Sequence, residues 1–437
     1  MAHRPLDDVA LVEEAQTEGD VAFALGELEV RPGTARSALR SRDFRVLWIA
    51  TLSSNVGTWM QNVALGAFAY QLSHSAGFVA LIGFAQLGPL LLLATVGGML
   101  ADAVDRRRLL MTTNLVQLVF SAVLAAVAAV PHPSRALLLL VVLAIGVANA
   151  LTGPPLASIL PTLVPRADLP GAIALQSVQM NLSRVVGPAI GGVLLPSIHA
   201  SGVFGINAAT YLFAVAGAYA IRPVARTRST EQGLRRLLGG FAVARHDPLV
   251  RSVVTLIASI SFFCLPFIGL MPVIAAENLG MSVTGFAYGL LYACFGLGAA
   301  CGAIAVGSVL VGYRRDRVVA GGLALFGLML LAFGLLRTSA PAYPVVFLVG
   351  LFYFATVTTL STRLQEHLHD DVRGRVMALY MMGFGGTIPV GLLVAGPIAA
   401  RTSITTVVVG GAAVAMLLAA RAAVGIVRPL LPVPDTD

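Results

Sequence analysis

A single arginine, Arg184, lies in the middle of the apolar stretch 171–195. A guanidinium in the middle of a membrane span is costly unless it is paired or hydrated, so this side chain is expected to face the interior of a helix bundle. Two interpretations stay open. Arg184 is either a structural charge that hydrogen-bonds carbonyls freed by Pro188, or a site for an anionic or carbonyl-bearing substrate or for coupling. We favour the functional interpretation because no other arginine is isolated within an apolar run.

A second group of polar side chains falls in residues 54–62, within an otherwise apolar stretch. Asn55, Trp59 and Asn62 follow an i, i+4, i+7 pattern, so a helix places them on one face. Such a face is costly against lipid and is expected to point inward. There it either hydrogen-bonds a neighbouring helix or contacts a substrate.

The remaining candidates for ligand contact are isolated polar residues in apolar runs and one tyrosine of the second half, namely Gln86, Asn149, Gln179 and Tyr292. The second half is otherwise rich in aromatic residues: Phe262, Phe263, Phe267, Tyr288, Phe295, Tyr353 and Phe354. Aromatic side chains commonly serve packing. An apolar cavity with few polar anchors, however, also suits amphipathic ligands.

Carboxylates are absent from the middle of every long apolar run. Asp102 and Glu277 each lie at the end of one, so these two are the only reasonable proton carriers, each with a structural interpretation still open. No cofactor is expected. The 3 cysteines lie inside apolar runs without the spacing of metal ligands, and a chain without lysine cannot contain a nucleotide-binding P-loop.

Membrane helices must position these residues, because 57% of the 437 residues are hydrophobic and only 11% are charged. This composition excludes a water-soluble globule, and a membrane helix needs about 20 mostly apolar residues. We predict an all-α integral membrane protein with twelve spans, at 44–71, 75–102, 109–130, 136–160, 171–195, 202–222, 250–276, 283–311, 317–336, 342–364, 376–400 and 402–428.

The arginines predict the orientation of these spans. Nearly all loop arginines fall on the side of the N-terminal tail, and only Arg135, Arg337 and Arg401 fall on the other side. Since cytoplasmic loops are enriched in basic residues, both termini are expected in the cytoplasm. The basic balance therefore reports topology, and we expect no nucleic-acid partner.

A long polar stretch divides the predicted spans into two sets of six, as expected for two parallel six-helix repeats with pseudo-symmetry. The predicted domains are a cytoplasmic N-terminal tail at 1–43, six-helix bundles at 44–222 and 250–428, a cytoplasmic linker at 223–249, and a C-terminal tail at 429–437. We interpret the N-terminal tail as mobile, with a short amphipathic helix as the alternative.

The loop between the second and third spans reads Gly97-Gly98-Met99-Leu100-Ala101-Asp102-Ala103-Val104-Asp105-Arg106-Arg107-Arg108. It resembles the signature loop of the major facilitator superfamily, although Ala103 and Asp105 depart from the usual pattern. The resemblance implies a gating role for Gly98, Asp102, Arg106 and Arg107. It also implies that Asp102 locks the inner gate against the start of span eleven, where Arg373 and Arg375 lie.

The fifth span carries a run of small residues around a proline, which includes Gly187, Pro188, Gly191 and Gly192. Proline and small residues in a membrane helix commonly mean a kink and a close-packing face. This run also resembles the glycine-proline-glycine-glycine motif of exporters in the same superfamily. It favours efflux over uptake.

A closer resemblance extends over almost the whole chain after residue 40. The segments 153–169 and 373–378, together with the fifth span, resemble the branch that contains the enterobactin exporter and the macrolide and Tap-type efflux pumps, also called transmembrane secretion effectors. The resemblance implies a single-component exporter of drugs, siderophores or other amphipathic small molecules, often driven by protons.

The sequence therefore predicts a monomeric transporter of the inner membrane that exports small amphipathic compounds by alternating access. Its expected partners are the lipid bilayer, a small-molecule substrate and, by resemblance, protons in antiport. A dedicated siderophore or metabolite exporter, or an importer, is the alternative within this class. An integral-membrane enzyme or sensor is a remote one, because no catalytic constellation and no room for a sensory domain are found.

Overall fold

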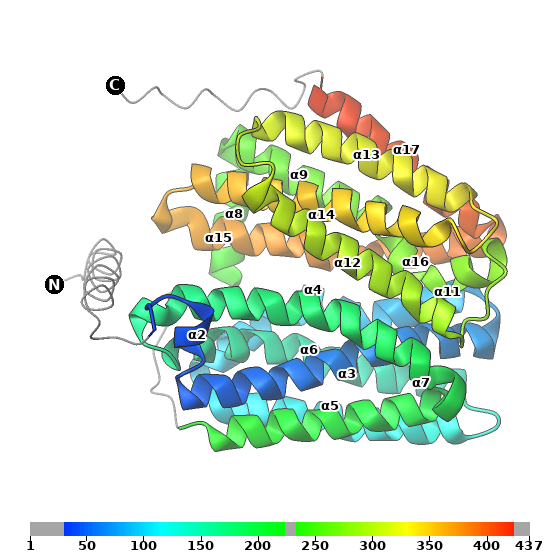
Figure 1. The fold of residues 1–437 in the computed structure, drawn as a ribbon, viewed down its shortest axis with the longest axis horizontal. Helices are drawn as coiled ribbons and strands as arrows, with labels where there is room; N and C mark the ends of the chain where they lie inside the picture. The colour runs from blue at the N-terminus through cyan, green and yellow to red at the C-terminus, as the bar shows by residue number, and fades with distance from the viewer. Residues whose placement is uncertain (1–29, 223–232, 424–437) are drawn as a thin grey trace.

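The computed structural model describes the backbone of residues 30–222 and 233–423, and a few side chains within these ranges are not described. The remaining parts of the predicted tails and linker lie outside the described residues. Within the described part, every regular element is helical. The helices form two stacked layers, α3–α7 below and α9–α17 above, with their axes along the long direction of the molecule (Figure 1).

The long helices of the first half, as far as the structure describes it, are α3 (Arg42–Ser73), α4 (Ala76–Ala103), α5 (Arg106–Ala129), α6 (Arg135–Ile159) and α7 (Leu169–Ala220). The 52-residue α7 is two helices joined across a kink, since His199 has the non-helical angles φ 57° and ψ 177°. This kink lies between the predicted fifth and sixth spans. Pro196, a residue without a backbone donor, precedes it by one turn.

The second half contains α9 (Pro248–Phe263), α10 (Pro266–Gly269), α11 (Met271–Val273), α12 (Phe286–Ser308), α13 (Arg315–Leu335), α14 (Ala342–His367), α15 (Asp370–Met381), α16 (Thr387–Arg401) and α17 (Ile404–Ala423). Two of its predicted spans are interrupted. In the predicted seventh span, Pro266 begins α10 and Pro272 lies in the first turn of α11. In the eleventh, a π-helical segment, Met382–Gly386, joins α15 to α16.

Nine helical segments of the described part are long and apolar enough to cross a membrane. One of them, Arg166–Ala220, has 55 residues, which is enough for two crossings. The multi-pass helical fold is thereby confirmed. The count of twelve crossings stays a prediction.

Polar side chains begin several helices by accepting hydrogen bonds from backbone N–H groups of the first turn. Asp105 accepts from Arg108 N at 2.9 Å at the start of α5, and Ser134 accepts from Leu137 N at 3.4 Å at the start of α6. These caps explain why the helices begin at the polar clusters that separate the apolar runs.

The two halves meet along two seams, where α7 packs against α12 and α4 packs against α16. Glycines permit the close approach. A Cβ built on Gly289 of α12 would lie 2.6 Å from Gly192 Cα and 2.7 Å from the Pro188 carbonyl oxygen of α7. A Cβ on Gly396 of α16 would overlap Ala80 of α4. Side chains at these positions would hold the halves apart.

Residues 30–41 differ from the mobile tail that we expected. The Thr34 side chain caps the short helix α2 (Ala35–Ala38), and the Gly33 N–H donates to Asp168 Oδ1 at 3.1 Å. Ala38 is fully buried in an apolar cluster with Phe44 and Leu160. Burial of this apolar surface holds the segment against α7.

Helix α8 (Gly233–His246) occupies much of the predicted linker and packs against α15. A Cβ on Gly240 would lie 2.6 Å from the Arg375 carbonyl oxygen, so the two backbones lie in direct contact. Both helices lie near the end of the molecule that carries α2 (Figure 1).

The turn between α8 and α9 is held by Asp247. Its Oδ1 accepts from the N–H groups of Leu249 at 2.8 Å and Val250 at 3.1 Å, and its Oδ2 contacts His367 Nε2 at 2.8 Å. Burial raises the pKa of this carboxyl, but the hydrogen bonds from His367 and from the two backbone groups outweigh it and leave the pKa below its usual value.

We expect Asp247→Ala to lower the stability of the protein by about 0.5–2 kcal/mol at pH 7, since a helix cap and a side-chain partner are lost. Because the pKa of Asp247 is lowered in the folded protein, its contribution is complete above about pH 4 and is lost as the pH falls through the folded value. Thermal unfolding of Asp247→Ala and of the unchanged protein is compared at pH 7 and below about pH 4, where the contribution of Asp247 is expected to be lost. His367→Ala, which removes the side-chain partner but keeps the helix cap, should lose only part of this stability. A deficit of equal size at both pH values would contradict the assignment.

Candidate functional site

A cluster of three side chains lies where the two halves meet. The guanidinium carbon of Arg184 lies 5.4 Å from the ring centroid of Trp59 and 4.7 Å from that of Phe354. Trp59 belongs to α3 and Arg184 to α7, both in the first half, whereas Phe354 belongs to α14 in the second. We call Trp59, Arg184 and Phe354 the arginine clamp. Each ring attracts the cation through the negative face of its π system.

Glycines position the clamp. A Cβ on Gly187 would lie 2.6 Å from Trp59 Cβ, so the missing side chain lets α7 approach α3 beside the clamp. A Cβ on Gly296 of α12 would lie 2.8 Å from the Arg184 carbonyl oxygen, so α12 also reaches the backbone of α7 here. Arg184 is therefore enclosed from both halves.

The guanidinium makes no hydrogen bond or ion pair with any described side chain or carbonyl among residues 30–222 and 233–423. Protein atoms surround it closely, although it keeps some accessible surface. The structural interpretation, in which carbonyls freed by Pro188 bind Arg184, therefore finds no such bond in the described part of the chain.

Two hydroxyl groups of the second half lie near the clamp. Tyr353 precedes Phe354 on α14 and lies near Arg184, and Ser261 of α9 lies beside Tyr353. Both side chains are almost fully buried. Neither hydroxyl has a hydrogen bond of good geometry to the described protein. In the sequence, Tyr353 was named only as one of the aromatic residues of the second half. Nothing in the sequence pattern pointed to Ser261 as a candidate site residue.

Polar side chains of α3 form hydrogen bonds with two neighbouring helices, α4 and α7. Asn62 accepts a short hydrogen bond from Gln86 of α4. The next residue before Asn62, Gln61, accepts a buried hydrogen bond of 2.8 Å from Asn207 of α7. These bonds satisfy the interhelical interpretation for Asn62 and Gln86, whereas Trp59 joins the clamp. A role for Asn55 and Asn62 in substrate contact stays a prediction.

The other predicted ligand contacts are dispersed. Gln179 is buried in α7, and Asn149 is exposed on α6. Tyr292 of α12 is buried and donates to the Ile268 carbonyl oxygen at 3.0 Å, in the interrupted region of α9–α11. Tyr292 therefore satisfies a carbonyl at a helix break. Within the described part of the chain, none of these three residues has a hydrogen bond or ring contact with a clamp residue.

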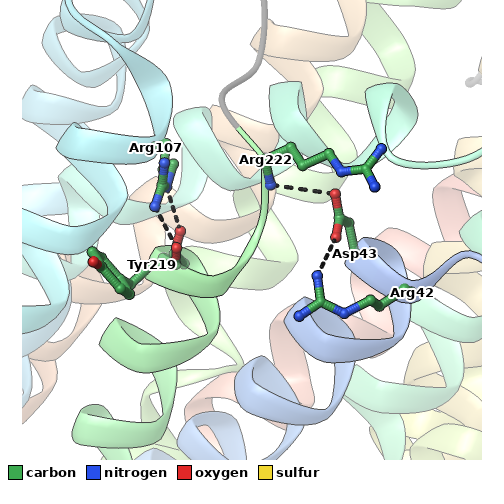
Figure 2. Close-up of polar contacts among 6 residues, drawn as sticks. Arg42, Asp43, Arg107, Tyr219 and Arg222 are labelled. Carbon is green, nitrogen blue, oxygen red and sulfur yellow. Dashed lines mark hydrogen bonds and ion pairs between the residues drawn. The ribbon is translucent and has the colours of Figure 1, made fainter.

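Arg107 of the signature loop binds carbonyl groups of the first half, to which it belongs itself. Arg107 Nε donates to the Ala218 carbonyl oxygen at 2.9 Å, its Nη2 donates to that of Tyr219, and its guanidinium lies over the Tyr219 ring (Figure 2). A cation at the C-terminal end of α7 is favoured by the free carbonyls and the helix dipole. Nearby, Asp43 Oδ2 accepts from Arg222 N at 3.2 Å (Figure 2).

The predicted inner gate is described only in part. The surroundings of Gly98 and the side chain of Asp102 lie outside what the structure describes, so the pairing of Asp102 with α15 stays a prediction. Arg373 donates to the Leu368 carbonyl oxygen at 3.2 Å, and the backbone of Arg375 contacts α8. Arg106 begins α5.

Glu277 lies at the opposite end of the molecule, in the π-helical segment Ile274–Asn278 that follows α11. It is exposed and accepts a hydrogen bond of 3.4 Å from Tyr70 of α3. The contact joins the two halves. A role in proton transfer stays a prediction.

The glycine-proline motif of α7 packs on two helices. Gly187 and Gly191 face α3, with a Cβ on Gly191 only 3.2 Å from Met60, whereas Gly192 faces Gly289 of α12. Pro188 presents its carbonyl to the same glycine of α12. This short motif thus sets the distance of α7 from α3 in the first half and from α12 in the second. Arg184 lies one helical turn before the motif.

The arrangement of two helical halves matches that of solved membrane transporters of the major facilitator fold. A mutant form of the nucleoside transporter NupG superposes with a TM-score of 0.73 at 14% identity, over 88% of this chain and 99% of that chain. A mutant form of the peptide transporter POT superposes with a TM-score of 0.69 at 14% identity, over 88% and 94% of the two chains. Identities this low show the fold alone.

Residues 33–436 match the transmembrane secretion effector family, and the chain belongs to this family. The staphyloferrin A transporter of Staphylococcus aureus is 26% identical over 351 residues, which cover 77% of this chain and 85% of that protein. The enterobactin exporter EntS of Shigella boydii is 28% identical over 343 residues, covering 77% and 80%. The predicted membership of this branch is confirmed, and the chain is a multi-pass membrane transporter rather than an enzyme.

Proposed function

We propose that this protein exports small amphipathic compounds across the cytoplasmic membrane by alternating access of its two halves to the two sides. The observation that carries the proposal is the arginine clamp, because Trp59 and Arg184 come from one half and Phe354 from the other. A ligand bound there would contact both halves, and a relative movement of the halves would change its access to either side.

Support for export comes from the glycine-proline motif of α7 and from the relatives, one of which is named an exporter of enterobactin. The second candidate is a dedicated siderophore exporter. It is favoured by the names of both relatives, which refer to staphyloferrin A and enterobactin. An importer is the remaining alternative, and broad drug efflux belongs to the first candidate.

We propose protons as the coupling ion, in antiport, with Glu277 and Asp102 as carriers. Glu277 accepts a hydrogen bond from Tyr70 of the other half, so a change in its charge would act on a contact between the halves. The proposed setting is the inner membrane with both termini in the cytoplasm, as the arginine distribution favours. We propose a monomer as the working unit.

The test is accumulation of fluorescent dyes, macrolides and a catecholate siderophore in cells with and without the protein, at equal amounts of membrane-inserted protein. We expect at least one compound to accumulate less in the producing cells, and a protonophore to abolish the difference. A difference restricted to the siderophore would favour the second candidate. Higher accumulation in the producing cells would contradict export, and a difference that survives the protonophore would contradict proton coupling.

A further inference from the structure

The guanidinium of Arg184 is attracted by two rings but lacks hydrogen-bond acceptors. An arginine carries five N–H donors in a rigid fork. Aromatic faces attract the charge, yet they do not replace full hydrogen bonds to that fork. Among the described atoms of residues 30–222 and 233–423, no acceptor is provided for it.

The hydroxyls of Tyr353 and Ser261 share this deficit. Both are buried beside the clamp and lack a hydrogen bond of good geometry to the described protein. Buried polar groups in folded proteins are normally satisfied, so a group of unsatisfied donors points to an absent acceptor. Arg184 and the adjoining hydroxyls of Tyr353 and Ser261 therefore have donor capacity left for an absent acceptor.

The acceptor does not come from the carboxylates that the structure describes, because each of these has a partner elsewhere. They are Asp43, Asp105, Asp168, Asp247, Glu277, Asp316 and Glu366. All lie at or beyond helix ends, or in the π-helical segment after α11. None of these described carboxylates therefore balances the charge of Arg184.

We propose that the arginine clamp, together with Tyr353 and Ser261, binds one carboxylate group of the exported compound. This inference rests on the proposed export function and names its substrate class. A carboxylate matches the guanidinium fork with two parallel hydrogen bonds and has further lone pairs for the two hydroxyls. The rings of Trp59 and Phe354 bind the flat apolar part beside it.

The charge of the site selects a carboxylate over a dianionic phosphate. One guanidinium and two neutral hydroxyls compensate a single negative charge, and a second charge would stay uncompensated in a buried setting. The donors also come from both halves, because Arg184 lies on α7 whereas Ser261 and Tyr353 lie on α9 and α14. The carboxylate therefore links the two halves across their interface.

The test measures binding without transport. Trp48→Phe leaves Trp59 as the remaining one of 2 tryptophans, so its fluorescence reports on the clamp itself. The full-length variant is placed in phosphatidylcholine nanodiscs, which exclude anionic lipid headgroups as competitors. Energy transfer from Trp59 to dansylglycine, a carboxylate, is compared with transfer to dansylglycinamide, its neutral counterpart of equal size.

We expect saturable transfer with dansylglycine and a Kd at least about tenfold lower than that of dansylglycinamide, which corresponds to about 1.4 kcal/mol. Arg184→Gln is expected to remove this difference, and Arg184→Lys to retain part of it. Tyr353→Phe and Ser261→Ala are expected to weaken dansylglycine binding severalfold without changing the amide. Arg337→Gln is the matched control, because Arg337 binds Thr405 and carbonyls at the end of α13.

Equal affinity for the two probes in the Trp48→Phe protein would overturn the inference, and so would full discrimination in Arg184→Gln. Failure to bind either probe saturably would also overturn it. The proposed function fails separately: a protein that binds dansylglycine as expected but changes the accumulation of no compound in cells would keep the carboxylate site and lose the export function.

Discussion

Replacing Gly298 with valine is expected to prevent the protein from folding stably in the membrane. Gly298 lies on α12, and a Cβ built there would overlap the carbonyl oxygen of Phe347 on α14. The obstacle is backbone, which cannot rotate away as a side chain could. Gly302 and Gly350 make equally close contacts between the same two helices, so the pair cannot separate at one point and stay packed at the others.

Overpacking costs about 1–3 kcal/mol and sometimes more, and a clash with a helix backbone belongs at the upper end. About 3 kcal/mol corresponds to a factor of more than 100 in a folding equilibrium. Gly307→Val is the matched control, since the same substitution on the same helix meets no atom within 4 Å. Two quantities are measured for each variant: the yield of monodisperse protein after detergent extraction, and the midpoint temperature of its thermal unfolding. Equal yields and midpoints for the two variants would contradict the packing of α12 on α14.

The second large effect is expected from Gly289→Val, which should stop transport while leaving each half folded. Gly289 lies on the seam between α7 and α12, where a Cβ would lie 2.6 Å from Gly192 Cα and 2.7 Å from the Pro188 carbonyl oxygen. Unlike the contact at Gly298, this one joins the two halves rather than two helices within one half. The halves can relieve it by separating, and we expect the seam to open at this end of α12.

We expect transport to fall at least about tenfold, because destabilising the closed seam by about 1.4 kcal/mol or more shifts the equilibrium by that factor. Thermal unfolding should change little. In the Trp48→Phe background, acrylamide should quench the fluorescence of Trp59 more strongly, since Trp59 packs beside the same segment of α7. Gly307→Val again serves as control. Normal transport in Gly289→Val, or unchanged quenching together with lost transport, would refute this account of the seam.

Much of the fold could be predicted because it depends on patterns within short stretches. Apolar runs predict where helices cross the bilayer, and prolines and polar clusters predict where they end. The structure begins α5 at Arg106 and α9 at Pro248, close to the predicted starts. The breaks around Pro266 and the π-helical segment Met382–Gly386 were missed, because an interrupted helix is as apolar as a continuous one.

The packing of residues 30–41 was also missed. The acidic composition of the N-terminal region favours a solvated tail, and only the tertiary structure brings Gly33 next to Asp168 across 135 positions of sequence. In the signature loop, the sequence pointed to Arg107 as a gating residue. The structure places its guanidinium on the carbonyl groups that end α7.

The sequence by itself determined the membrane class, the family and the unusual position of Arg184, since an isolated charge in an apolar run is visible without any knowledge of its neighbours. Only the tertiary structure decided which residues surround that charge. Trp59 lies 125 positions before Arg184 and Phe354 lies 170 after it, and all three meet through the packing of α3, α7, α12 and α14. Helix periodicity tells which residues share a face, but the partner of that face is set by close packing between helices, and that depends on glycines and side-chain shapes spread over the whole chain.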